Sequence, residues 1–316
     1  MNAVFVSHFA TALGSRRQSL EEAAVLGQLV SPPAALRSVG FESHYICDDA
    51  ETAYDLAASA FRASSIEVDD VDVIVYSTCL PINGNEADPS GFAASRDVKD
   101  LMRFPASKLQ ADFGMRDAII IGINQQACTG MLGAIRVGRS LLLAEPDIEI
   151  VLCITADRFP PGAFYEQAYN LVSDGAAACR LGRTPAGMRL LHLHQLSNGG
   201  MVDAGDEQTA TCFFAYTCRL IDELTARAGL RVADIDWIVP QNLNRTALEI
   251  LCGLLGAKQD RVFCPAIAQT GHAISADNVA NLRELVNSGR LERGDVVLTF
   301  MAGYGCHWQG ALLEAL

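Results

Sequence analysis

The chain repeats one order of elements, namely helix, strand, loop, helix, strand, in two successive stretches of its sequence. The elements of the first stretch are expected at residues 53–63, 71–77, 126–143 and 149–155, and those of the second at residues 219–228, 235–240, 270–286 and 295–300. Two copies of one α/β unit in a single chain pack back to back and place equivalent loops around a pseudo-twofold axis. The repeat therefore predicts an α/β fold with a shared site at that axis, although alternating elements also recur by chance in α/β proteins.

The boundary between the two copies is expected near residues 182–187. Residues 183–186 read Arg-Thr-Pro-Ala, which is the clearest linker-like run in the chain. We therefore divide the chain into an N-terminal half, residues 1–184, and a C-terminal half, residues 185–316.

The composition is that of a globular protein with a large core. Half of the 316 residues are hydrophobic and only 19% are charged, which excludes a disordered chain or a coiled coil. The longest apolar runs, residues 118–123 and 148–154, predict buried strands and are far shorter than the roughly 20 residues of a membrane-spanning helix. The first 13 residues lack the basic start and the continuous apolar stretch of a secretion signal, so we expect a cytoplasmic protein with no membrane partner. The formal net charge of −13 argues against a nucleic-acid partner.

The ten cysteines do not form a disulfide or metal-binding pattern. They are scattered through apolar runs, without CxxC pairs and without metal-ligand spacing. We expect most of them to be small core residues, among them Cys79, Cys153, Cys179, Cys252 and Cys264.

Cys128 is the candidate nucleophile of the N-terminal half. It follows an apolar strand pattern and lies where a long amphipathic helix begins, between alanine and glycine neighbours that leave room for a substrate. Free N–H groups and the helix dipole at such a position favour a negative charge and lower the pKa of a thiol. The alternative is a packed, inert cysteine, which is the usual role of a buried cysteine.

Four segments carry a resemblance to a known family. Residues 124–130 read Asn-Gln-Gln-Ala-Cys-Thr-Gly and resemble the active-cysteine segment of ketoacyl-ACP synthase III enzymes. Residues 173–178, 289–295 and 303–313 follow in the family's order and resemble its aspartate-glycine-alanine turn, its glycine-arginine-leucine run and its closing glycine-rich segment with a tryptophan. The likeness covers nearly the whole chain.

The resemblance implies a thiolase fold, with duplicated βαβαβ halves in a five-layered α-β-α-β-α arrangement. It also implies a homodimer, or a heterodimer with a related chain, and acyl-thioester substrates carried by coenzyme A or by the phosphopantetheine of an acyl carrier protein. No metal, nicotinamide or flavin cofactor is expected. By match to the family, the backbone N–H groups of Cys128 and Gly305 form the oxyanion hole for attack on a thioester.

The chain departs from the family at two catalytic positions. The family's usual histidine follows a proline, and here that place is Gln241 after Pro240. The family's usual asparagine follows a glycine, and here that place is His272 after Gly271. A cysteine-histidine pairing of this kind resembles divergent members of the family in specialised metabolism, including an alkylquinolone-forming condensing enzyme and acyltransferases that esterify sugars.

His272 is therefore the candidate base, contributed by the C-terminal half. An imidazole with an ordinary pKa of about 6.5 can take the thiol proton and later that of an acceptor. The alternative is a histidine that is only hydrogen-bonded in the core.

Neighbouring residues are given supporting or structural roles. Gln241 is expected to orient a carbonyl, and Asn244 either supplies a remaining amide or only ties down its loop. Asp277 is expected to cap a helix rather than to orient His272, because helical spacing does not bring the two together. His307 is expected to be structural. The family's tryptophan for gripping coenzyme A is absent from residues 36–40.

These observations favour an acyltransferase or condensing enzyme of specialised metabolism, which forms an acyl thioester on Cys128 and passes it to a carbon, amine or hydroxyl nucleophile. Loss of the ordinary histidine and asparagine, which together stabilise a thioester enolate in the family, puts malonyl decarboxylation in doubt. Two alternatives stay open: a housekeeping initiation synthase of fatty-acid synthesis, and a non-catalytic partner subunit of a heterodimer.

Overall fold

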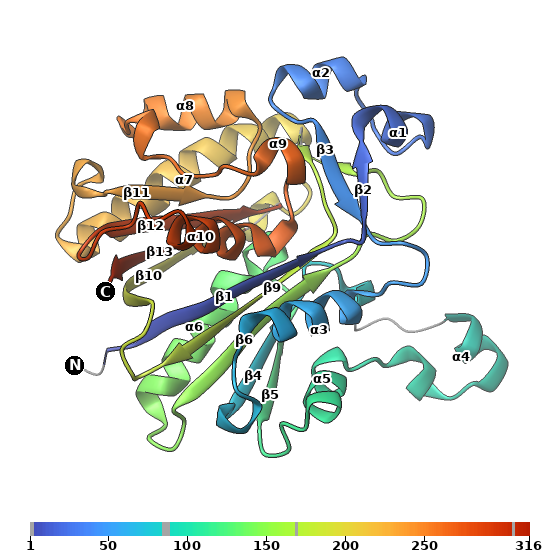
Figure 1. The fold of residues 1–316 in the computed structure, drawn as a ribbon. Coiled ribbons are helices and arrows are strands. Elements are labelled where there is room, and N and C mark those ends of the chain that lie inside the picture. The colour runs from blue at the N-terminus through green and yellow to red at the C-terminus, as the bar shows by residue number, and fades with distance from the viewer. Residues whose placement is uncertain (1–2, 84–88, 168–169, 305–306) are drawn as a thin grey trace.

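The computed structural model describes residues 3–83, 89–167, 170–304 and 307–316. Within these residues, nine strands form one sheet in the order β11-β12-β13-β10-β1-β9-β6-β4-β5 (Figure 1). The strands of the first half are β1 (Phe5–Leu13), β4 (Val73–Ser77), β5 (Ile119–Ile123), β6 (Ile150–Asp157) and β9 (Gly175–Gly182). Those of the second half are β10 (Met188–Ser197), β11 (Trp237–Pro240), β12 (Val296–Gly303) and β13 (His307–Ala315).

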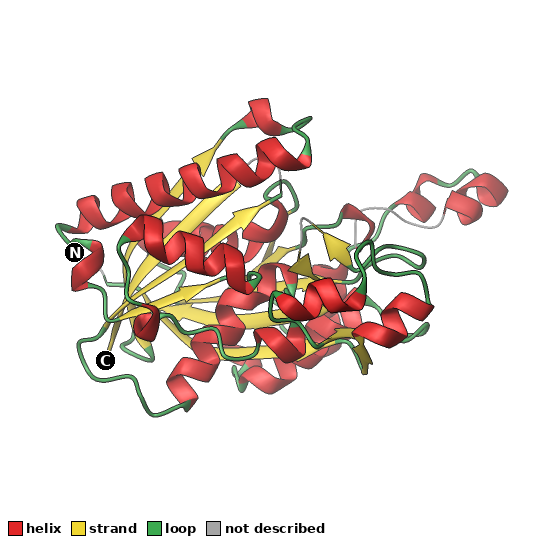
Figure 2. Ribbon diagram, turned by 90° about the horizontal axis from the view of Figure 1, so that it is seen from above, coloured by secondary structure: helices red, strands yellow, loops and turns green. Residues whose placement is uncertain are grey.

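The two groups of strands are joined only where β1 and β10 begin, through the pairs Phe5–Arg189 and Val6–Met188. Beyond these pairs the two groups separate, and helices α6 (Gly130–Ala144) and α10 (Asp277–Asn287) pack between them (Figures 1 and 2). Helices α3 (Ala53–Ser64) and α5 (Pro105–Phe113) cover the outer face of the first group. Helices α7 (Asp206–Ala228) and α8 (Arg245–Leu255) cover the outer face of the second. The described residues therefore confirm the five-layered arrangement of the thiolase fold.

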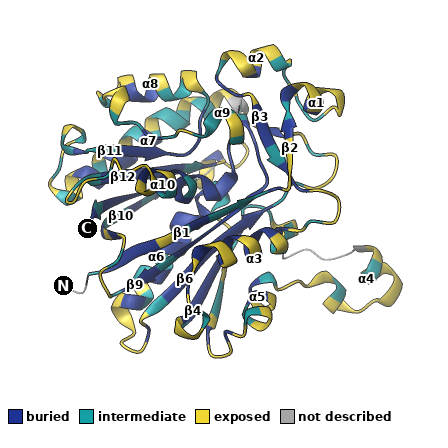
Figure 3. Ribbon diagram, viewed as in Figure 1, coloured by how far each residue is buried: buried dark blue, intermediate teal, exposed yellow. Residues whose placement is uncertain are grey.

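The layers follow from the alternation of apolar side chains along each strand. In β4, Val73 and Val75 point into the central core with α6 and α10, whereas Ile74 and Tyr76 point into the outer core with α3. The strands of the second half alternate in the same way between the central core and the core beneath α7. Because both faces are covered by helices, central strands such as β4 and β6 are apolar and buried along nearly all of their length, and Figure 3 shows them in the colour of buried residues.

The central helix α6 is apolar for the same reason. The segment Ala127–Ala144 is long and apolar enough to cross a membrane by length and composition alone. Half of it is buried within the protein, where it contacts strands of both groups. Its composition is thus explained by its place in the core.

The predicted internal repeat is confirmed by the element order, in which α3, β4, α6 and β6 correspond to α7, β11, α10 and β12. The parallel bridge between Ile238 and Val262 lies where β5 lies in the first half. The start predicted for the last helix is wrong, because α10 begins at Asp277 rather than near residue 270. Positive φ angles at Gly271 (56°) and Ile274 (52°) interrupt the helix that the pattern suggested.

The prediction that residues 118–123 form a buried strand is only partly right. β5 is the last strand of the sheet order among the described residues, and Ile119 is 53% exposed while Ile121 and Ile123 are half-buried. The run at β6 is buried as predicted. Within the described part of the chain, no strand pairs with the apolar outer edge of β5.

Smaller elements lie beyond the layers. The hairpin of β2 (Arg16–Ser19) and β3 (Ser43–Ile46), the helices α1 (Leu20–Val25), α2 (Pro33–Ser38) and α9 (Ile267–Thr270), and the short pair β7 (Glu166–Gln167) and β8 (Asn170–Leu171) gather at one end of the molecule. Helix α4 (Pro89–Ser95) projects away from the body of the protein in both ribbon views (Figures 1 and 2).

The connection between β9 and β10 contains the predicted boundary at residues 184 and 185, and Gly187 in it has a φ of 65°. A Cβ atom there would lie 2.5 Å from the carbonyl oxygen of Val6. We expect Gly187→Ala to lower the free energy of unfolding by about 2–4 kcal/mol, as the sum of left-handed strain and overpacking. The measurement is urea denaturation.

Gly229→Ala is the matched control, because Gly229 has a φ of 68° but no described atom within 4 Å of an added Cβ. It should cost only the left-handed strain, about 1–2 kcal/mol. Equal losses in the two variants would contradict the close approach of this connection to β1.

Candidate active site

Cys128 lies on a tight turn between β5 and the central helix. A single 3₁₀ turn, Ala127–Thr129, carries it, and α6 follows directly at Gly130. Ala127 has a φ of 45°, a strained value for a residue other than glycine. The turn packs against the end of β12, where a Cβ on Gly303 would lie 2.9 Å from the carbonyl oxygen of Gln126. The predicted position at the start of a buried helix is therefore found, with a strained backbone beneath the sulfur.

His272 lies on a loop of the second half that is held by backbone of the first half. Its N–H donates to the carbonyl of Leu171 (2.7 Å), and its own carbonyl accepts from Ser173 N–H (2.9 Å). The side chain is 7% exposed. The ring is thus placed by a short parallel bridge between the halves rather than by a helix.

Asp277 contacts the imidazole directly, so the expectation that it only caps a helix is wrong. Its Oδ2 is 2.5 Å from His272 Nδ1 and accepts from Asn242 N–H (2.7 Å), while Oδ1 accepts from Ala273 N–H (2.7 Å). Helical spacing does not apply, because the chain turns at Ile274 and brings Asp277 back to the ring. The carboxylate is fully buried.

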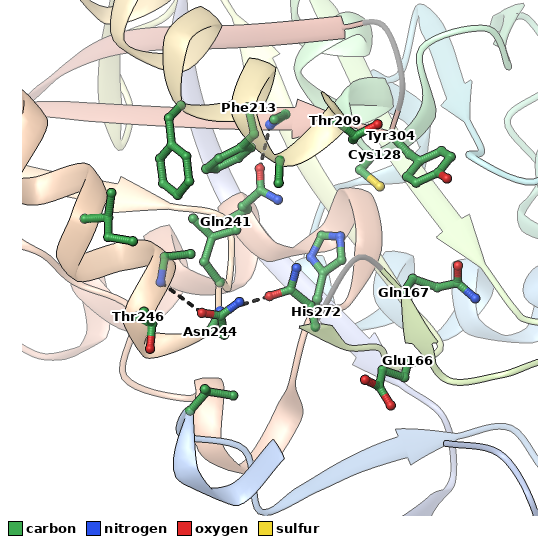
Figure 4. Close-up of a pocket in the computed structure, with 18 of the residues that line it drawn as sticks. Cys128, Glu166, Gln167, Thr209, Phe213, Gln241, Asn244, Thr246, His272 and Tyr304 are labelled. Atoms are coloured by element: carbon green, nitrogen blue, oxygen red, sulfur yellow. Dashed lines mark hydrogen bonds between the residues drawn. The ribbon is translucent and has the colours of Figure 1, made fainter. Parts of the chain in front are cut away.

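Cys128 and His272 line the same cavity and lie close enough for each to shift the pKa of the other. Asp277 engages Nδ1 of the ring, which leaves Nε2 as the ring nitrogen for the thiol, and Figure 4 shows the Cys128 sulfur and the His272 ring in one part of the cavity. Burial opposes the charged ring, but the Asp277 carboxylate and the contact with Cys128 raise the pKa of His272 to about 10.

Hydrogen bonds lower the pKa of the Cys128 thiol well below its ordinary value. The first is to the thiol of Cys79, and His272 and the backbone N–H of Tyr304 add to it, while burial acts in the opposite direction. A lowered thiol pKa beside a raised imidazole pKa favours a thiolate–imidazolium pair.

A cavity of about 480 Å³ opens onto Cys128 and His272 (Figure 4). Most of its wall is apolar, from α2, α7 and α8, and β7 contributes Glu166 and Gln167. The Glu166 carboxylate is 7% exposed and accepts from the N–H groups of Val30 and Ser31. Leu36 and Val39, from the region where the family's tryptophan was sought, form part of the wall. The described residues contain no group of three or more side chains suited to a metal ion.

Gln241 and Asn244, the two residues with predicted supporting roles, both line this cavity but differ in their hydrogen bonds. Gln241 Oε1 accepts the N–H of Ala302 (2.5 Å), which leaves its amide NH₂ as the donor that can face a substrate. Asn244 Oδ1 caps α8 by accepting the N–H of Ala247 (2.9 Å). The geometry thus favours the loop-tying role for Asn244.

Two further sequence expectations concern residues near the end of the chain. Gly305, expected to complete the oxyanion hole, lies outside the described residues. His307 makes a hydrogen bond between its Nδ1 and the hydroxyl of Ser197 (3.0 Å) and does not line the cavity.

Cys79 is the site residue that sequence reasoning missed, because it was grouped with the core cysteines. It is half-buried, and its neighbour Cys128 raises the pKa of its thiol. A signal was present in the sequence, since Cys79 and Cys128 each follow an apolar strand of the same half. The described cysteines are free thiols.

Comparisons with known proteins show what the chain is similar to. A family model described as "3-Oxoacyl-[acyl-carrier-protein (ACP)] synthase III C terminal" matches residues 225–315. A beta-ketoacyl-[acyl-carrier-protein] synthase III of Rhodospirillum centenum is 28% identical over 305 residues, which cover 87% of this chain and 88% of that protein. A solved structure described as ChlB3, an acyltransferase, has a TM-score of 0.82 and 21% identity, and covers 99% of this chain and 98% of its own. The 3-oxoacyl-[acyl-carrier-protein] synthase III of Aquifex aeolicus has a TM-score of 0.79 and 18% identity, with coverage of 98% and 99%.

Replacing Asp277 by asparagine should destabilise the site, because three donors converge on the carboxylate and an amide keeps only one acceptor atom. We expect Asp277→Asn to lower the free energy of unfolding by about 1–3 kcal/mol, the cost of leaving a buried donor unsatisfied. Alkylation of Cys128 at neutral pH should also slow, since the imidazolium loses the carboxylate that supports it.

Asp234→Asn is the control, because Asp234 pairs with the exposed Arg231 on the surface. Its cost should be no more than about 1 kcal/mol, with Cys128 alkylation unchanged. If the two variants lose equal stability and alkylate at the wild-type rate, Asp277 does not support the imidazole.

Proposed function

The chain is a member of the ketoacyl-ACP synthase III-like family of acyl-transferring condensing enzymes, and from that premise we propose that it transfers an acyl group through a thioester on Cys128 to a hydroxyl or amine acceptor. The observation that carries the proposal is the placement of Cys128 and His272 on the wall of one cavity, with Asp277 hydrogen-bonded to the ring of His272. The acyl donor is a thioester of coenzyme A or of an acyl carrier protein, and the pathway is one of specialised metabolism.

In the first step the Cys128 thiolate attacks the carbonyl carbon of the donor thioester. The new carbon–sulfur bond forms as the carbonyl oxygen takes the negative charge, and N–H groups of Cys128 and Gly305 are the proposed donors to that oxygen. When the intermediate collapses, the donor's carbon–sulfur bond breaks. Its departing thiolate takes the proton from His272 Nε2, which leaves acyl-Cys128 beside a neutral imidazole.

In the second step neutral His272 takes the proton of an acceptor O–H or N–H as the acceptor attacks the acyl thioester. The ester or amide bond forms, the bond to Cys128 breaks, and the thiolate–imidazolium pair is restored. Asp277 holds the ring with Nε2 toward the sulfur and stabilises the imidazolium in both steps. A base supported in this way suits an acceptor that must lose a proton.

Decarboxylation of a malonyl acceptor requires a different reaction from proton removal at a hydroxyl or amine. It releases carbon dioxide and leaves an enolate, which in the ordinary family is stabilised by a histidine and an asparagine. Here those places are Gln241 and His272, and His272 is engaged as an ion pair with Asp277.

A carbon acceptor is the second candidate, favoured by the names of the relatives. Those that match most of the chain are called synthases, as is the priming β-ketosynthase of a polyketide pathway among the solved structures. The third reading, a non-catalytic partner subunit, does not account for a lowered pKa at Cys128. A homodimer is part of the proposal, and the apolar edge of β5 supports it.

The test is covalent labelling by acyl donors. Wild-type protein incubated with a panel of acyl-CoAs and acyl-loaded carrier proteins should gain the mass of one acyl group for at least one donor, measured on the intact protein. Cys128→Ala should gain none, and Cys212→Ala should label as wild type because Cys212 lies on α7 outside the cavity wall. Absence of any adduct on wild type would favour the partner-subunit reading.

The class of acceptor is identified by adding candidate acceptors to the labelled protein and measuring the loss of the acyl group from Cys128. Hydroxyl and amine acceptors should discharge acyl-Cys128, and His272→Ala should discharge at least about 100-fold more slowly, the lower range for a positioned general base. His307→Ala should discharge as wild type. Discharge by malonyl-loaded carrier protein with release of carbon dioxide, and not by hydroxyls or amines, would establish the carbon acceptor instead.

A further inference from the structure

Three neighbouring parallel strands end beside one another behind the nucleophile. β4 pairs with β5 on one side and with β6 on the other, and Ser77 is level with Ile123 and Thr155. The carboxyl ends of parallel strands meet at one edge of a sheet, so the residues that follow them gather there. Cys79, two residues beyond Ser77, is therefore level with Asp157, and the end of β4 lies against the turn that carries Cys128, because a Cβ on Gly130 would lie 3.2 Å from the Cβ of Ser77.

Asp157 fixes the position of Cys79. This carboxylate is 1% exposed, and its Oδ1 accepts from the hydroxyl of Thr78 (2.7 Å) and from the N–H groups of Cys79 (2.8 Å) and Leu80 (3.2 Å). The amide of Asn83 donates to the same atom (3.1 Å). One buried acceptor thus holds the whole turn that presents the Cys79 side chain.

The thiols of Cys79 and Cys128 lie close enough for each to shift the pKa of the other, and the directions of the two shifts make Cys79 the donor. The contact with Cys128 and burial, together with the charges of Cys128 and Asp157, raise the pKa of the Cys79 thiol. The same contact lowers the pKa of Cys128. The two sulfurs are therefore unequal: Cys79 keeps its proton, and Cys128 carries the negative charge.

We propose that Cys79 is a positioning residue for the nucleophile, whose S–H donates a hydrogen bond to the Cys128 thiolate and orients it toward the cavity. The inference rests on the proposed role of Cys128. It adds a second side-chain hydrogen-bond donor to the thiolate, besides the ring of His272. The sulfur of Cys128 is then held by three groups: Cys79, the ring of His272 and the N–H of Tyr304.

The proposal also assigns a role to the buried carboxylate. Burial raises the pKa of Asp157 to about 6. Its charge raises the pKa of Cys79, and the charge of Cys128 raises the pKa of Asp157 in turn. Cys79, His272 and the backbone N–H of Tyr304 lower the pKa of Cys128, while Asp157 acts on Cys79 and Asp277 acts on His272.

The experiment is a pH profile of Cys128 alkylation by iodoacetamide, followed on the Cys128 peptide by mass spectrometry. Cys79→Ala should move the midpoint of this profile upward by about one pH unit, which is a roughly tenfold slower reaction below the midpoint. Cys79→Ser keeps an O–H donor and should restore most of the shift. Cys218→Ala, on α7, should leave the midpoint unchanged.

Cys79→Val is the second variant, because it fills the space of the thiol without a donor, and thermal unfolding identifies any variant that fails to fold. It should move the midpoint as Cys79→Ala does. Midpoints equal to wild type in both variants would overturn the inference, as would equal shifts in Cys79→Ser and Cys79→Ala, which would indicate packing alone. A wild-type midpoint at the ordinary value of a thiol, about 8.5, would instead overturn the thiolate on which the proposed function depends.

Discussion

The pairing of the Cys128 thiol with the ring of His272 on the wall of one cavity is the constraint on which the rest of the structure depends. The thiol comes from the first half of a duplicated fold and the imidazole from the second. Each lies on a loop whose backbone contains an unusual φ, 45° at Ala127 and 52° at Ile274, and Ser275 of one loop donates to the carbonyl of Ala127 of the other (3.4 Å). Such strain persists only where the surrounding structure over-determines it, and here the packed layers of both halves do so.

Burying a thiolate, an imidazolium and a carboxylate together is costly unless every charge is paired and hydrogen-bonded. The carboxylate of Asp277 accepts from Asn242 and Ala273 in addition to the ring. Asn242 is held in turn, because its side chain donates to the carbonyl of Gly271 (2.7 Å) and accepts from Asn281 (3.0 Å). This polar network ties the tip of β11 to the loop of His272, so the orientation of the ring is a property of the fold rather than of one side chain.

The sequence allowed the fold to be predicted where local pattern and long-range packing agree. Apolar residues along the strands predicted the layers. Small residues at the start of α6 pointed to Cys128. His272 was found through resemblance, as a histidine at a place where the family has an amide. Asp277 was misjudged because helical spacing was assumed for a segment that Gly271 and Ile274 break. Cys79 and Cys128 each follow an apolar strand, but no local pattern shows that these two strands are neighbours in the sheet. The exposed edge of β5 depends on the same order of strands.

The most direct measurement of the central claim is the ultraviolet absorbance of the Cys128 thiolate as a function of pH, taken as the difference between wild type and Cys128→Ala. The pKa of Cys128 is lowered and that of His272 is raised to about 10, so the thiolate signal should persist as the pH falls well below the ordinary thiol value of about 8.5. In His272→Ala the signal should disappear at a higher pH than in wild type. A signal that is lost near the ordinary thiol pKa in both proteins would contradict the ion pair.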